Sequence, residues 1–239
     1  MTAMKRMIKA GGRRLEYILI QSVRQDVLFQ VLPEGVPRVY APKYMRLRDI
    51  DEMVRQRAEA LLQMQRDVDQ RLEENRRLHP VTEGSVIFIE GVPCVLHLQA
   101  GQRIAGAIAD GEFHLTLPRP DSDPDVRAAI RSVLSARALE RIRSRLAFYV
   151  PRIGRAPGRV TVRDQKSRWG SCSSKGNLNF NWKLIMAPPQ ALDYVVIHEL
   201  CHLYEFNHSP RFWQRVQGQM PDYASWKKWL KVHGGDLFL

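Results

Sequence analysis

The chain has 239 residues, which is long enough for one large domain or two small ones with a hydrophobic core. Hydrophobic residues make up 44% and charged residues 26%, which is typical of a soluble globular protein, and no apolar run approaches the length needed to cross a bilayer. Its three cysteines include no CxxC pair, and the basic N-terminus lacks a signal-peptide pattern. The sequence therefore predicts a cytoplasmic protein with neither a disulfide framework nor a membrane association.

The net charge is +12, and the surplus is uneven along the chain. Residues 1–80 hold 16 Lys and Arg against 11 Asp and Glu, whereas residues 151–239 hold 13 against 6. Such a surplus attracts nucleic acid or acidic partners. A generic basic surface that aids solubility is slightly favoured, because no nucleic-acid motif accompanies the charge.

The first half of the chain alternates strand patterns with one long helix. Three short β-rich segments fall within residues 15–41, and a polar helix is predicted over 47–78, ending before Pro80. Two hairpins follow, over 85–99 and 104–118; Asp110-Gly111 suits the tight turn of the second. Because 118–125 is rich in proline and aspartate, we expect a domain boundary there, between a β-rich region at 1–118 and a second domain at 119–239.

The second half begins with a helix predicted to run from Asp123 to about Val150, with Asp123 as its N-cap. A strand at 159–164 and a polar loop at 165–176 come next. Residues 177–182 alternate strictly, with apolar residues on one side and asparagines on the other. The segment is either an ordinary half-buried strand with its asparagines in water or an edge strand that binds an extended peptide. In the second case the substrate-binding residues would be Asn177, Asn179 and Asn181.

A helix beginning at Pro188-Pro189 carries the sequence HELCH. His198 and His202 are four residues apart on one face, where Cβ atoms lie about 5–6 Å apart, so both imidazoles can reach one Zn²⁺. Glu199 points to the flank of that face, a position that suits a general base acting on water at the metal. Burying these side chains without partners would cost several kcal/mol, and coordination supplies the partners.

A catalytic zinc site needs a third protein ligand and one open position. His208 is the candidate, on a predicted break between two helices. We expect Asn207 to end the first helix in the left-handed conformation, and Ser209 to cap the next helix with Pro210 at its first position. A further donor must stabilise the oxyanion, and the candidates, each also explicable as structural, are Arg168, Tyr204 and Asn207.

The stretch RWGSCSSKGNLNFNWKLIMAPPQALDYVVIHELCHLYEFNHSPRFWQRV closely resembles the YgjP-like metallopeptidase family, which is related to the SprT-like and WLM zinc proteases among the zincins. The resemblance is strongest over residues 160–232. It implies an α+β fold whose minimal zincin-like core combines a helix, a small antiparallel or mixed sheet, the HExxH helix and C-terminal helices, preceded by the hairpin-rich region and long helix. It also implies one Zn²⁺ held by His198, His202 and His208, with Glu199 catalytic.

The resulting hypothesis is a zinc-dependent metallopeptidase that cleaves a peptide or protein substrate. The alternative is a basic nucleic-acid-associated zinc protein, which includes a protease acting on DNA-bound protein, as SprT-like relatives do. The basic segment at 151–168 motivates it, through Arg152, Arg155, Arg159, Arg163, Lys166 and Arg168. Three histidines and a glutamate favour the peptidase, because structural zinc sites are usually closed by four ligands.

Overall fold

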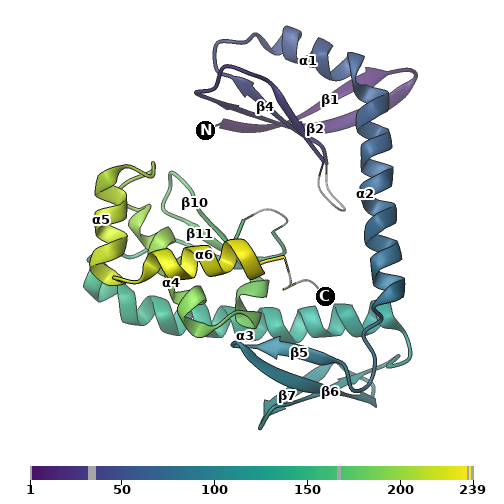
Figure 1. Ribbon diagram of the computed structural model, residues 1–239, viewed down its shortest axis with the longest axis vertical. Helices are drawn as coiled ribbons and strands as arrows, with labels where there is room; N and C mark the ends of the chain where they lie inside the picture. Colours follow the sequence, from purple (N-terminus) through teal and green to yellow (C-terminus); the bar gives the residue numbers. More distant parts are fainter. Residues whose placement is uncertain (1, 32–35, 166–167, 236, 238–239) are drawn as a thin grey trace. The chain divides into compact units, whose positions relative to one another are not determined.

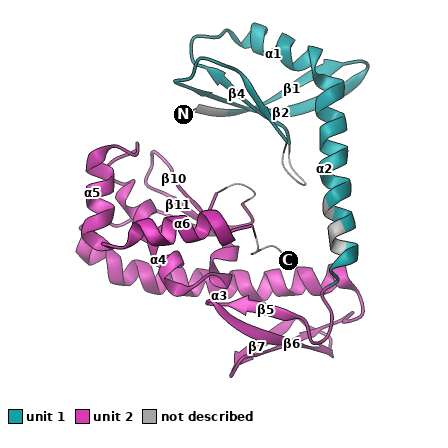
Figure 2. Ribbon diagram, viewed as in Figure 1, with its two compact units in different colours: residues 1–80 teal, residues 81–239 magenta. Residues whose placement is uncertain are grey.

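The computed structural model describes residues 2–31, 36–165, 168–235 and 237, apart from the side chains of residues 2, 3, 72, 75 and 76. The chain divides into two compact units, residues 1–80 and 81–239 (Figure 2). The division falls at Pro80 and not at the boundary expected near residue 118. The physical reason is that strands from both hairpins of 81–118 share one hydrophobic core with the following long helix.

Unit 1 is a four-stranded sheet of order β1-β2-β4-β3 with two helices (Figure 1). β1 and β2 are antiparallel, β2 and β4 are parallel, and β3 is antiparallel to β4. The expected helix at 47–78 is interrupted at Arg57, and β1 was not anticipated because its Lys and Arg residues obscure the alternation. The elements are β1 (Thr2–Ala10), β2 (Arg13–Ser22), β3 (Leu28–Gln30), β4 (Arg38–Pro42), α1 (Leu47–Gln56) and α2 (Ala58–Leu78).

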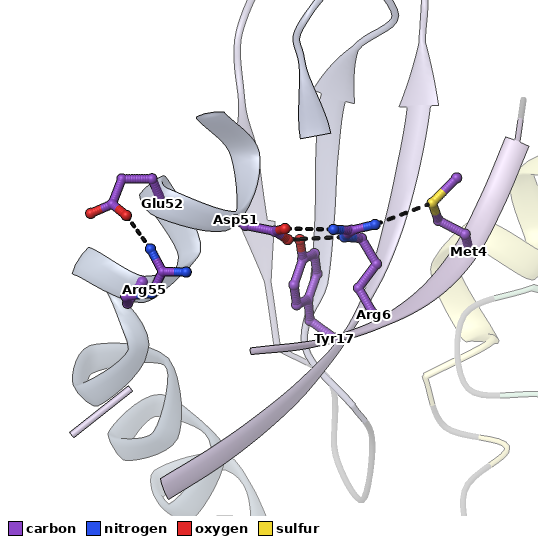
Figure 3. Close-up of polar contacts among 6 residues, drawn as sticks. All are labelled: Met4, Arg6, Tyr17, Asp51, Glu52 and Arg55. Atoms are coloured by element: carbon purple, nitrogen blue, oxygen red, sulfur yellow. Dashed lines mark hydrogen bonds and ion pairs between the residues drawn. The ribbon is translucent and has the colours of Figure 1, made fainter. Parts of the chain in front are cut away.

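A polar cluster joins α1 to the sheet of unit 1 (Figure 3). Arg6 on β1 donates through Nε to Asp51 Oδ1 at 2.9 Å, and through Nη2 to the other carboxylate oxygen. The hydroxyl of Tyr17, a fully buried side chain on β2, donates to the same carboxylate at 2.5 Å. Asp51 therefore connects the helix to two strands, beside a core that includes Ile50 and Val54.

Unit 2 begins with a sheet of order β5-β6-β8-β7, and the long helix α3 lies along one face of it (Figure 1). Both residues of the predicted tight turn have positive φ, 52° at Asp110 and 79° at Gly111, as that turn type requires. α3 begins at Asp123, with Ser122 in the N-cap position one residue earlier than expected, and ends at Ile153, followed by the left-handed Gly154. The elements are β5 (Val86–Ile89), β6 (Val92–Ala100), β7 (Ala105–Ala109), β8 (Glu112–Leu117) and α3 (Asp123–Ile153).

The rest of unit 2 is a three-stranded sheet and the C-terminal helices. The sheet order is β10-β11-β9, with β11 antiparallel to β10 and parallel to β9. α4 is in contact with α3, α5, α6 and β10, so it lies at the centre of this half. The elements are β9 (Val160–Arg163), β10 (Gly170–Cys172), β11 (Leu178–Asn181), η1 (Trp182–Met186), α4 (Pro189–Cys201), α5 (Pro210–Gln219) and α6 (Tyr223–His233).

The fold is thus a mixed α+β arrangement, as the sequence indicated. Among the described residues, no helix combines the length and apolar character that spanning a bilayer requires.

Candidate metal centre

α4 carries two of the candidate ligands on a helix that is buried along most of its length. It starts directly after Pro188 and ends at Cys201, which puts His198 in its last turn and His202 at its C-cap. Ser209 caps α5 as predicted, since its hydroxyl accepts from the backbone N–H of Phe212 at 3.3 Å. The expected role of Asn207 is wrong: α4 stops before it, and Asn207 is not among the described residues with positive φ.

The structure brings the three candidate imidazoles together. His198 Nε2 lies 3.1 Å from His202 Nε2 and 3.1 Å from His208 Nε2, and one nitrogen from each ring falls within 4.8 Å of the others. Tetrahedral coordination with Zn–N bonds of about 2.0–2.1 Å places ligand nitrogens about 3.3 Å apart. The donor set therefore fits a single zinc ion, and over the described parts of the chain it is the one such group of three or more His, Cys, Asp or Glu side chains.

The surroundings keep these imidazoles neutral, which is the form that binds a metal. Burial, with smaller effects from His202, His208 and Lys227, lowers the pKa of His198 to about 3. Burial also lowers the pKa of His202 and of His208. The Nδ1 atom of His202 lies 2.9 Å from the carbonyl oxygen of Glu205, so Nδ1 carries the proton and Nε2 presents its lone pair to the centre.

Glu199, which follows His198 on α4, has a buried carboxyl group. Its side chain belongs to a residue only 4% exposed, and its Oε2 has no hydrogen-bond partner among the described residues. Burial raises the pKa of Glu199 to about 8, and the positive charge of Arg168 opposes that shift. Burying an acid without a hydrogen-bond partner makes the folded state less stable, so the presence of Glu199 here indicates a functional role.

Gly170 on β10 lets the backbone approach that carboxyl group. A Cβ at this position would lie 2.6 Å from Glu199 Oε1 and 2.8 Å from its carboxyl carbon, closer than real side chains pack. β10 was hidden from sequence analysis in the polar loop expected at 165–176, because three residues of Gly, Ser and Cys show no strand periodicity. Through Gly170, this segment lies against Glu199.

Aromatic side chains surround the imidazoles. The Trp213 ring is stacked on His208 with centroids 5.5 Å apart and on Tyr223 at 5.3 Å, while the buried Phe212 lies 4.5 Å from His202. Tyr194 lies 5.7 Å from His198, and sequence reasoning missed it. Its position four residues before His198, one helical turn away, was the signal that could have found it.

The three oxyanion candidates have different surroundings. The hydroxyl of Tyr204 donates to the carbonyl of Ile153 at 3.0 Å, and two guanidinium groups lie over its ring, so it ties α3 to the end of α4. Asn207 is exposed in the turn before α5. Arg168 is exposed and acts electrostatically on Glu199. Of the three candidates, Arg168 is thus the one whose charge acts on the buried carboxyl group of Glu199.

Asn179 and Asn181 of β11, and Asn177 just before it, make hydrogen bonds within the fold, and the alternative of an edge strand is wrong. β11 is the central strand, because β10 pairs on one side and β9 on the other. The Asn177 side chain accepts from the N–H of Arg159, and that of Asn179 accepts from the Thr161 hydroxyl. Asn181 is only 4% exposed and donates to the carbonyl of Gln165, whereas Asn177 is exposed.

Two arginines of the basic segment at 151–168 make hydrogen bonds within unit 2. Arg152 donates to the carbonyl of Phe148 at 2.6 Å, and Arg155 donates to the carbonyl of Leu203. Lys166 lies outside the described residues. These contacts leave less of the segment for a nucleic acid than the sequence suggested.

The family model of the YgjP-like metallopeptidase domain matches residues 25–233, which is most of the chain. Neither a curated protein nor a solved structure matched the chain. The matched range contains β10, α4 and the turn that carries His208. The chain therefore belongs to the YgjP-like family, whose model describes a metallopeptidase domain.

Proposed function

We propose that the protein is a zinc-dependent metallopeptidase in which His198, His202 and His208 hold one Zn²⁺. The single observation that carries this is the convergence of three imidazole nitrogens, one of them on the residue that precedes the buried Glu199, whose Oε2 has no described hydrogen-bond partner. A site of three protein ligands leaves one position for substrate or water, which is typical of catalytic zinc. In this proposal α3, the β10-β11-β9 sheet, α4 and the C-terminal helices form a minimal zincin-like core.

Zinc at this centre supplies Lewis-acid chemistry, which polarises a carbonyl and makes water more acidic. Glu199 accepts the proton of the attacking water and delivers it to the amine that leaves. Its raised pKa is a property of the metal-free protein, and Glu199 is a stronger acid when a dication lies beside it, so the carboxylate form is then available. Arg168 favours the same form through its charge.

The open side of β10 is the proposed place for the substrate backbone. β10 is an end strand of its sheet, and its Gly170 touches Glu199. An extended peptide paired with β10 would therefore run past the general base, held by backbone hydrogen bonds. This assigns to β10 the part that the sequence hypothesis gave to residues 177–182.

The first experiment compares the parent with Glu199→Gln in metal content and in a proteome-derived peptide cleavage screen. We expect the variant to keep its zinc and to lose cleavage by about 10²–10⁴-fold, the usual contribution of a positioned general base. Equal cleavage by the two proteins would exclude the role assigned to Glu199.

Substitution of His208 tests the third ligand. We expect His208→Ala to lower the zinc content after dialysis, whereas His233→Ala, at the end of α6, leaves it unchanged. Full zinc occupancy in His208→Ala would mean that another group completes the site.

A further inference from the structure

Two positively charged side chains flank the candidate metal centre from different elements. Lys227 on α6 places its Nζ 4.1 Å from the centroid of the Trp213 ring. That indole in turn has its centroid 5.5 Å from His208 and 5.9 Å from His198. The Lys227 ammonium and the His208 ring are thus both in contact with the same indole ring.

Arg168 provides the second positive charge, on the segment that leads into β10. It precedes Gly170 by two residues, and its backbone carbonyl accepts from the side-chain amide of Asn181 at 3.4 Å. Gly170 itself is in contact with Glu199. One cation thus lies near the imidazoles and the other near Glu199.

Neither cation has a carboxylate within ion-pair distance in the described parts of the chain. Other arginines of unit 2 do: Arg145 pairs with Asp193, and Arg137 with Glu90. Lys227 and Arg168 are both exposed, so a ligand can reach them. The face of Trp213 is the one described partner of the Lys227 ammonium, which leaves ammonium donors for another group.

We propose that Lys227, assisted by Arg168, makes this site select substrates with a carboxylate next to the scissile bond. The proposal rests on the peptidase function and names its substrate class. A carboxylate adjacent to the bound backbone would gain a charge-assisted hydrogen bond from Lys227, whereas a lysine or arginine there would meet two like charges. The carboxylate belongs either to an acidic side chain or to the free C-terminus of a short peptide.

The test uses the zinc-loaded full chain and metal-chelating probes that need no cleavage. Three hydroxamate-capped dipeptides differ in their last residue, which is glutamine amide, glutamate amide or glutamine with a free carboxylate. Dissociation constants come from calorimetry at low salt. We expect one of the two carboxylate probes to bind about two- to fivefold more tightly than the neutral one, the range for exposed ion pairs, and the tighter of the two identifies the source of the carboxylate.

Lys227→Gln should bring that affinity ratio close to one, and Lys227→Glu should favour a probe ending in lysine amide. Lys228→Gln is the matched control, because it removes the same charge from the neighbouring exposed position on α6, and it should keep the parent ratio. Equal binding of the three probes by the parent, or a ratio unchanged in Lys227→Gln, would overturn the proposal.

Failure of the selectivity and failure of the peptidase function give different results. If the probes bind equally and Glu199→Gln abolishes cleavage, only the substrate class is wrong. If no hydroxamate binds the zinc-loaded chain, or if Glu199→Gln cleaves like the parent, the peptidase function is wrong. The selectivity proposal is then wrong as well, because it rests on that function.

Discussion

At the scale of single residues, the reactivity of the candidate site depends on how Glu199 is held. The carboxyl group is buried, and that burial raises its pKa to about 8. Because its Oε2 has no described hydrogen-bond partner, few contacts fix the direction of the group. The close approach of Gly170 limits where the carboxyl group can lie. A glycine is required there for space and not for its backbone angles, since it is not among the glycines with positive φ.

Gly170→Ala tests this packing. The added methyl group would lie 2.6 Å from Glu199 Oε1, so the carboxyl group or β10 has to move. We expect peptide cleavage to fall by about 10²-fold, as for misplacement of a catalytic group by about 1 Å, while zinc content is kept. Gly218→Ala, where the added methyl group meets open space, is the control and should leave cleavage unchanged. Full activity in Gly170→Ala would mean that the contact does not position the acid.

At the scale of elements, α4 is fixed to α3 by a polar clamp. Arg145 on α3 donates to both carboxylate oxygens of Asp193 on α4, at 2.5 Å and 2.7 Å, and the Tyr149 hydroxyl donates to the same group at 3.0 Å. This interaction raises the pKa of Arg145. Because Asp193 lies upstream of His198 on one helix, the clamp sets the placement of the candidate ligands.

Asp193→Asn should weaken this clamp while preserving its shape. We expect a loss of about 1.5–3 kcal/mol in the free energy of unfolding, the usual contribution of hydrogen bonds to a charged group, measured by urea denaturation of the metal-free protein. The control is Asp49→Asn, which removes an exposed partner of Arg46 and should cost about 1 kcal/mol or less. Equal losses in the two variants would show that the clamp adds nothing beyond a surface ion pair.

At the scale of the whole molecule, the chain builds two cores, and only unit 2 contains the candidate metal centre. Unit 1 depends on the cluster of Arg6, Tyr17 and Asp51 to attach α1 to its sheet (Figure 3). Hydrogen bonding from Arg6, supported by Tyr17, holds the pKa of Asp51 below its usual value. A lowered carboxyl pKa makes the folded unit more stable above the unfolded-state pKa of about 3.9, and that stability is lost as the pH falls below it.

Asp51→Asn therefore should matter at neutral pH and not in acid. We expect faster hydrogen exchange of β1 and β2 amides in the variant at pH 7. The difference from the parent should shrink below about pH 4, where Asp51 of the unfolded parent takes up a proton, and should vanish once the pH falls below the lowered pKa of the folded state. Exchange in the α4 segment serves as the internal reference. A difference between variant and parent that stays constant down to pH 3 would exclude this linkage.

The sequence by itself determined the features that depend on neighbouring residues: the turn at Asp110-Gly111, the cap at Ser209, and the spacing that sets His198 and His202 one turn apart. These follow from backbone geometry and from helical periodicity, which need no knowledge of distant segments. The strands of the first hairpin and the helix after Asp123 were predictable for the same reason.

Only the tertiary structure decided which distant segments meet. In the tertiary structure the boundary between the units falls at Pro80, and β11 is a central strand. Gly170 is in contact with Glu199, and Lys227 lies over the Trp213 ring. The tertiary structure also folds His208 back beside His198. Such contacts arise from burial of apolar surface among elements far apart in the chain, and that packing, unlike a helix or a turn, leaves no local periodicity to read.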